Sequence, residues 1–211
     1  CPEHPPGPSN SFEFDCPTRT TKINPDNYSE TSPYQQSVVP GLLQTEGYAA
    51  AMIRAFSPGE SVDKVRRMVE ARMLRQDTLE NEDAQFLFIL DEAVLRRRVG
   101  GPAVMRAQLL RLAELASARI RIMIFPFGVG AHAALAGPIT LFEFTEDVPP
   151  FVYLENARGS ATISTASELA ATYLELFLDL EEKSVKDHVP EILRRIADAM
   201  GTEPAEFTLP D

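Results

Sequence analysis

The sequence has no tryptophan and, among 211 residues, only two cysteines and three histidines. Both cysteines, Cys1 and Cys16, lie near the start of the chain. A disulfide between them is possible, but a count of two is weak evidence for one. Together with His4 they offer fewer than the four ligands that structural zinc requires. We therefore expect free thiols, no metal site and no cofactor.

Positive charge and long apolar runs are also scarce. Lys and Arg number 20 against 31 Asp and Glu, so the net charge is −11. A protein that follows a nucleic-acid backbone needs clustered basic residues, so we expect this chain alone not to bind nucleic acid. No apolar run approaches the roughly 18–20 residues of a membrane span, and no signal-peptide pattern is present. We expect a cytoplasmic protein without membrane contact. Because the numbering does not open with Met, we also expect it to start inside a longer chain.

The common catalytic signatures are missing as well. There is no Gly-x-Ser-x-Gly elbow, no His-Glu-x-x-His, no phosphate loop and no Cys-x-x-Cys. The glycines of residues 128–130 lack the third glycine of a dinucleotide site. No period of about 20–50 residues recurs, which excludes a solenoid. Apolar residues make up 44% and charged residues 24% of the chain, a mixture that suits one globular domain with a sizeable core.

What the sequence does contain is an apolar turn followed by a helix start, at residues 39–49. Pro40 and Gly41 favour a sharp turn, and Thr45 is placed to cap the helix that follows. The two leucines between them would be unusual in an exposed loop, so we expect this loop to be buried. A buried loop has to satisfy its own backbone groups, and Gln44 can either do that or face a ligand.

Apolar patterns elsewhere predict both helices and strands. Residues 86–90 form a continuous apolar run between acidic residues, which is typical of a strand buried on both faces. We expect further strands over 120–125, 139–144 and 151–154, and helices from Ser61, over 102–117, along 169–180 and after Pro190. The predicted class is α+β, with a small mixed β-sheet covered by helices. The last two helices either cover the sheet or form a dimer face.

The chain is predicted to hold a single domain at residues 34–200. An extended N-terminal arm or linker, residues 1–33, precedes it, and a tail, residues 201–211, follows it. The arm is rich in Pro, Ser, Thr and Asn and shows little periodicity apart from the alternation of Phe12 and Phe14.

Polar side chains near the predicted element ends are the candidate binding residues. Arg72 and Gln76 fall on or beside an apolar helical stripe, where an unpaired amide would cost about 1–3 kcal/mol. Asp91 and Glu92 end the strand at 86–90, and ligand groups tend to gather at such strand ends. Acidic residues at a helix start would give the same pattern. The predicted ligand-binding set is Gln44, Tyr48, Arg72, Gln76, Asp91, Glu92, His132 and Glu155.

His132 and Glu92 are also the candidates for catalysis. His132 lies in a glycine-containing loop, and an imidazole can act as acid or base if a carboxylate orients it. The structural alternative is that a lone loop histidine serves only as a surface or hydrogen-bonding residue. The same alternative applies to Arg72 and Gln76, which neighbouring carbonyls and carboxylates could satisfy.

Several motifs, in their order and spacing, resemble one known family. They are Pro-Gly-Leu-Leu-Gln-Thr at 40–45, Val-Glu-Ala-Arg at 69–72, Leu-Asp-Glu-Ala at 90–93, Val-Gly-Gly-Pro at 99–102, Phe-Pro-Phe at 125–127 and Val-Tyr-Leu-Glu at 152–155. Over roughly residues 34–200 the chain resembles the DUF5753-like C-terminal domain of actinobacterial, Scr1-type antitoxin-like transcriptional regulators. In that family a helix-turn-helix DNA-binding domain precedes this domain, whereas residues 1–33 show none.

The resemblance implies an effector-sensing or protein-contacting domain of a transcriptional regulator, whose partner is a small-molecule ligand or a partner protein. Homodimerisation is left open by the last two helices. Because a fold does not fix a function, the alternative is a stand-alone enzyme of secondary metabolism that reuses the same pocket. The sensor and the enzyme both require that the polar residues above enclose one recess.

Overall fold

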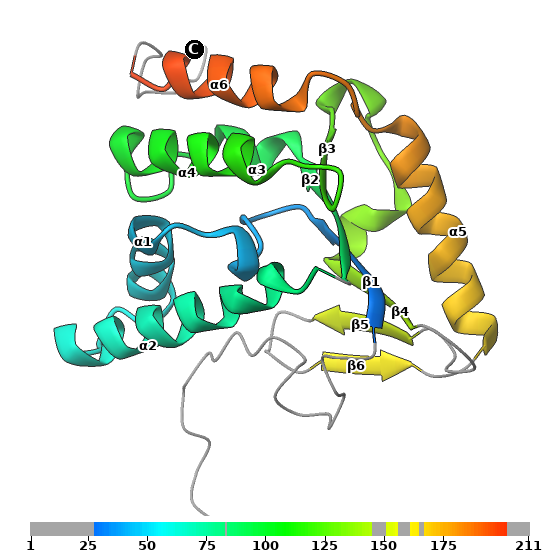
Figure 1. The fold of residues 1–211 in the computed structure, drawn as a ribbon, viewed down its shortest axis with the longest axis horizontal. Helices are drawn as coiled ribbons and strands as arrows, with labels where there is room; N and C mark the ends of the chain where they lie inside the picture. The colour runs from blue at the N-terminus through cyan, green and yellow to red at the C-terminus, as the bar shows by residue number, and fades with distance from the viewer. Residues whose placement is uncertain (1–27, 83, 145–150, 156–160, 165–166, 202–211) are drawn as a thin grey trace, which may run out of the picture.

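The computed structural model describes residues 28–82, 84–144, 151–155, 161–164 and 167–201. In this part of the chain a six-stranded mixed sheet is covered by helices on both faces (Figure 1). The predicted α+β class and single domain are confirmed. In the same residues, every helix is too short or too polar to cross a membrane.

The sheet joins a parallel half to an antiparallel half. Its strands are β1 (Tyr28–Gln35), β2 (Gln85–Asp91), β3 (Ile120–Phe125), β4 (Ile139–Phe144), β5 (Phe151–Glu155) and β6 (Ala161–Ser164). They lie in the order β3-β2-β1-β4-β5-β6. β1 and β3 both run parallel to β2, whereas β4, β5 and β6 form an antiparallel meander beside β1. β3 and β6 are therefore the two edges of the sheet.

The helices are α1 (Glu46–Phe56), α2 (Val62–Leu74), α3 (Glu92–Arg96), α4 (Pro102–Leu115), α5 (Ser167–Lys183) and α6 (Val189–Ala199). Short 3₁₀ turns add η3 (Gly41–Leu43), η4 (Arg75–Glu80), η5 (Phe127–Val129) and η6 (Ala133–Ala136). The starts of α1, α2 and α4 are those the sequence predicts, because the signals for them are local. Thr45 caps α1 by accepting from the Tyr48 amide, and Ser61 caps α2 in the same way. Pro102 occupies the first turn of α4, as expected.

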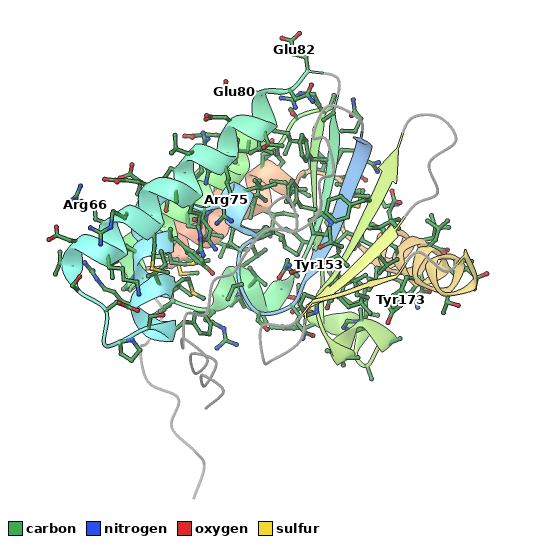
Figure 2. The ribbon with its side chains drawn as sticks, turned by 90° about the horizontal axis from the view of Figure 1, so that it is seen from below. Arg66, Arg75, Glu80, Glu82, Tyr153 and Tyr173 are labelled. Carbon is green, nitrogen blue, oxygen red and sulfur yellow. The ribbon has the colours of Figure 1, made fainter. Side chains whose placement is uncertain are left out.

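Two apolar cores lie on opposite faces of the sheet. β2 is buried on both faces, as predicted, and its side chains alternate between the cores. The first core takes residues from α1, α3, α4 and α6, and the second takes residues from β1, β4 and α5. Figure 1 shows α5 alone on one side of the strands and the other helices on the opposite side. Figure 2, seen from below, shows α2 and η4 on the opposite side of the strands from α5, with Arg66 and Glu80 towards the two ends of this segment and Tyr173 on α5. Of the two terminal helices, α5 covers one face of the sheet, whereas α6 packs mainly on α4 and contributes to the first core.

The strand β1 corrects the predicted arm. It begins at Tyr28, within the stretch predicted as an arm, and lies between β2 and β4 in the middle of the sheet. Its sequence was misleading because it is largely polar and contains Pro33, a residue that argues against a central strand. Strand β6 was not predicted either. The remainder of the arm (residues 1–27, with Cys1, His4 and Cys16) and of the tail (residues 202–211) lies outside the described residues.

Candidate functional site

The predicted binding residues form two groups rather than one. Gln44, Tyr48, Arg72 and Gln76 gather around η3 and the start of α1, where Leu43 and Tyr48 belong to the first core. Asp91, Glu92 and His132 lie where the parallel strands β2 and β3 end, beside residues of the second core. Glu155 is in β5, opposite Ala161 of β6, and its side chain lies outside the description. The two groups pack beside different residues of the cores, and because the Glu155 side chain is not described, the expectation of one common recess stays a prediction.

In the first group, side chains hold the backbone of the loop at residues 39–45. Gln44 is buried; its Nε2 donates to the Val39 carbonyl over 2.7 Å, and its Oε1 accepts from Arg72 Nη1 over 2.9 Å. Gln76 Nε2 donates to the carbonyls of Gln44 (2.7 Å) and Gly41 (3.2 Å). Every amide and guanidinium group in this set therefore already has a partner inside the protein.

Two more side chains complete that arrangement. The Val39 amide donates to the Tyr48 hydroxyl over 3.1 Å, and burial raises the pKa of this tyrosine above its ordinary value. Gln108 of α4, which is fully buried, donates from Nε2 to the Leu43 carbonyl over 2.7 Å. Its Oε1 accepts from the Thr45 amide, also over 2.7 Å. The first group is therefore a structural clamp on a buried loop.

Gln108 is the residue that sequence reasoning missed. It lies on the buried side of α4 together with Met105, Leu109 and Leu112. A glutamine in an apolar helical stripe has to find a partner, and this is the signal that drew attention to Gln76 on the preceding helical segment. Applied to α4, the same rule would have found Gln108 but not the loop that it holds.

In the second group a buried tyrosine–aspartate pair connects β1 to β2. Tyr34 Oη donates to Asp91 Oδ2 over 3.3 Å, and Asp91 Oδ1 accepts from the Ala93 amide over 2.8 Å. Burial, together with the charge and hydrogen bond of Asp91, raises the pKa of Tyr34 far above its ordinary value, so this hydroxyl stays protonated. Asp91 thereby caps α3, which confirms the structural alternative of a helix start.

His132 packs into the aromatic residues beside this pair. The centroid of its ring is 4.5 Å from that of Phe125 and 5.8 Å from that of Tyr34. Its Nδ1 is buried and has no hydrogen-bond partner among the described residues. A buried nitrogen without a partner is uncommon in folded proteins, and it marks His132 as the polar group of this site that is still free to bind.

Glu92 fixes the loop that carries His132. Its Oε1 accepts from Arg96 Nε over 2.7 Å, and its Oε2 accepts from the Phe127 amide over 3.0 Å. Burial acts to raise the pKa of Glu92, but these two donors and the charge of Arg96 outweigh it, and the pKa is lower than the ordinary value. Both oxygens are thus engaged in holding α3 and η5 together, and the group stays ionised at neutral pH.

A groove lies away from both groups, at the outer edge of β3. Its volume is about 290 Å³. It is lined by the end of α4, by β3 and by the segment that leads into α6; the lining residues are Ala116, Ser117, Ile120, Arg121, Ile122, Met123, Lys186, Val189 and Pro190. None of the predicted site residues lies in it. Sequence reasoning could not find it, because which strand forms an edge depends on the order of the whole sheet.

Residues 29–188 match the family described as domain of unknown function DUF5753. The chain belongs to this family. Searches of curated proteins and of solved structures found no match. The matched residues run from β1 through α5, so the DUF5753 domain includes the whole sheet and starts before the predicted boundary at residue 34.

The DUF5753 domain offers no evident metal site in the described residues, where no three His, Cys, Asp or Glu side chains are grouped as a metal ion would need. Its polar residues at the ends of β2 and β3 are a tyrosine, two carboxylates and one histidine. Of these, Asp91 and Glu92 are already bonded within the protein. Among the described residues, the His132 Nδ1 is a buried side-chain nitrogen without a hydrogen-bond partner.

Glu92→Gln should weaken the DUF5753 fold at neutral pH by about 1 kcal/mol, because a carboxylate accepts more strongly than an amide. A lowered pKa in the folded state means that the charge stabilises the protein above the ordinary value of 4.5. This contribution disappears as the pH falls through the folded-state pKa. Urea unfolding of both proteins at about pH 7 and about pH 3 would measure it. A difference that persisted unchanged at the acidic pH would contradict this role.

Proposed function

We propose that this chain is the partner-binding domain of a transcriptional regulator of the antitoxin-like type that its sequence resembles, and that it acts through protein contacts. The observation that carries the proposal is the groove at the edge of β3, a concave surface on an edge strand. Proteins commonly use an exposed sheet edge to bind a segment of another protein. Membership of the DUF5753 family is compatible with this role and does not by itself assign it.

The hydrogen bonds within the first group also favour protein contacts over effector sensing as the function. An effector at Gln44, Arg72 or Gln76 would have to replace hydrogen bonds that hold a buried loop. Each displaced group would need an equally good partner in the ligand, since an unsatisfied buried group costs about 1–3 kcal/mol. An effector that bound there would have to break these hydrogen bonds first, so the first group is not a preformed ligand site.

Small-molecule sensing is the second candidate, and one observation favours it. The buried His132 Nδ1 has no partner among the described residues, and it lies beside Tyr34 at the ends of the parallel strands. Ligands of sheets covered by helices tend to bind at such ends. The enzyme alternative is weaker, because both oxygens of Glu92, its other candidate, already accept hydrogen bonds from Arg96 and the Phe127 amide.

Co-expression with the proteins encoded by neighbouring genes would test the proposal. We expect one of them to form a stoichiometric complex with this chain, as measured by native mass spectrometry and light scattering. We also expect no submicromolar binding of duplex DNA by the chain alone at physiological salt, because its net charge is −11. The proposal fails if every such protein leaves the chain uncomplexed. Sensing is favoured instead if a small molecule raises the melting temperature of the wild-type protein but not that of His132→Leu.

A further inference from the structure

Along the outer edge of β3, the backbone groups of Ile120 and Ile124 are hydrogen-bonded, whereas Ile122 lies between them without such a partner in the described part of the chain. At one end Ile120 is bonded through its amide and its carbonyl to Ser117. At the other end Ile124 exchanges two backbone hydrogen bonds with Val185, of 3.1 and 2.8 Å. In a strand, alternate residues direct their amide and carbonyl to the same side, so Ile122 faces the outer edge as well. No hydrogen bond to these two groups of Ile122 is found among the described residues, although the residue as a whole is only 5% exposed.

The groove lies at this open position. Ile122 lines it together with Ser117 on one side and Lys186 on the other, and the chain turns away at Val189 and Pro190 into α6. One backbone donor and one backbone acceptor are therefore presented in a concave surface of about 290 Å³. An added strand satisfies such a pair, because it exchanges both hydrogen bonds with a single residue.

The charge around the groove selects among possible segments. Arg121 and Lys186 are its only ionisable lining residues, and both are basic. Their side chains are 46% and 44% exposed, and both approach the same carboxylate, Glu181, at 2.7 and 3.8 Å. The charged side chains that line the groove are thus both basic, on a protein whose total charge is −11. The neighbouring acidic residues are Glu181, which both cations approach, and Asp187, which follows Lys186 in the chain.

We propose that an extended acidic segment of the partner protein binds in this groove as a short added strand. One of its residues exchanges two backbone hydrogen bonds with Ile122, as Val185 does with Ile124. Acidic side chains next to that residue reach Arg121 and Lys186. The backbone contacts give affinity, and the two cations give the preference for acidic over basic sequence. This inference rests on the proposed function and names the partner chemistry that it requires.

The first test uses a synthetic peptide and the ¹⁵N-labelled full chain. The probe is an acetylated and amidated three-residue peptide, Glu-Val-Glu, because a longer strand centred on Ile122 would meet Ser117 and Val185. We expect it to shift the amide resonance of Ile122 and to slow the hydrogen exchange of that amide. The Ile124 amide, already bonded to Val185, is the internal control and should change little. A peptide with lysines in place of glutamates, and one N-methylated on its central valine, should each bind at least about tenfold more weakly.

Charge-reversal variants provide the second test. Arg121→Glu and Lys186→Glu should each weaken binding of the acidic peptide about tenfold. Arg106→Glu is the matched control, because Arg106 is an exposed arginine paired with Asp198 near the C-terminal end of α6, whereas the groove meets its N-terminal end. That control should bind the peptide as the wild-type chain does.

Several results would overturn the inference. One is an acidic peptide that leaves the Ile122 amide unchanged, and another is a lysine peptide that binds equally well. An Ile122 amide already protected in the free chain would show that the edge is occupied by the chain itself, or by a second copy if the protection rises with concentration. A partner that forms its complex equally well with Arg121→Glu and Lys186→Glu would preserve the proposed function and place its site elsewhere. If the acidic peptide binds but no natural partner is found, the proposed function is wrong, whereas the groove remains a peptide-binding site.

Discussion

Gln108→Leu should lower the free energy of unfolding by about 3 kcal/mol, although it replaces a polar residue by an apolar one of similar size in a fully buried position. The expected destabilisation comes from the loop at residues 39–45, which loses hydrogen-bond partners, rather than from α4 itself. Without the glutamine, the Leu43 carbonyl and the Thr45 amide lose hydrogen bonds of 2.7 Å each. The bond to the Leu43 carbonyl is buried and that to the Thr45 amide is partly buried, and each unsatisfied buried group costs about 1–3 kcal/mol. Urea unfolding followed by circular dichroism would measure the change.

Gln76→Leu is the matched control for this experiment. Gln76 also donates to loop carbonyls, those of Gln44 and Gly41, but it is only partly buried. Water can replace its hydrogen bonds, so we expect a loss below about 1 kcal/mol. Equal effects of the two substitutions would show that the loop is not clamped from α4.

Arg72→Ala should destabilise the chain by about 2–3 kcal/mol even in the absence of any ligand. The Arg72 side chain is only 8% exposed, and its guanidinium donates to the Oε1 of Gln44. Removing it leaves a buried amide oxygen without this donor and withdraws the Cδ methylene that lies beside Gly41. Thermal and urea unfolding of the purified variant would report the loss.

Arg66→Ala on the same helix is the control for Arg72. Arg66 is 61% exposed and pairs with Asp63 and Glu70 on the surface, so its removal should cost below about 0.5 kcal/mol. A double-mutant cycle of Arg72→Ala with Gln44→Ala should give a coupling of about 1 kcal/mol. The structural role is wrong if Arg72→Ala unfolds like the wild type. If the same variant also loses a ligand-induced thermal shift, the first group is an effector site after all.

Local signals explain why so many elements could be predicted. Thr45 and Ser61 accept hydrogen bonds within their own first turns, and Pro102 needs no partner outside its helix. The continuous apolar run of β2 likewise identifies a strand buried on both faces without reference to its neighbours. Each of these features depends only on residues that are close together in the sequence.

The site could be predicted only in part, because its partners are distant in sequence. The types of residue were recognised: Gln44 in a buried loop and Asp91 at a strand end are both bonded, and each has a distant partner, Arg72 and Tyr34 respectively. What each one bonds to depends on helices and strands that come much later or earlier in the chain, as with Gln108 and the loop. The polar strand β1 shows the same limit, since its place in the sheet is decided by β2 and β4.

The position of β1 has a consequence for the order in which the chain folds. This strand leads the described part of the chain, yet its parallel partner begins at Gln85 and its antiparallel partner at Ile139. Long chain segments must therefore be closed into loops before the central strand gains either neighbour, and such long-range pairing slows folding. During synthesis the ribosome would release most of the domain before the middle of the sheet could be completed. The centre of the sheet therefore cannot be completed until β4 has been synthesised and has paired with β1.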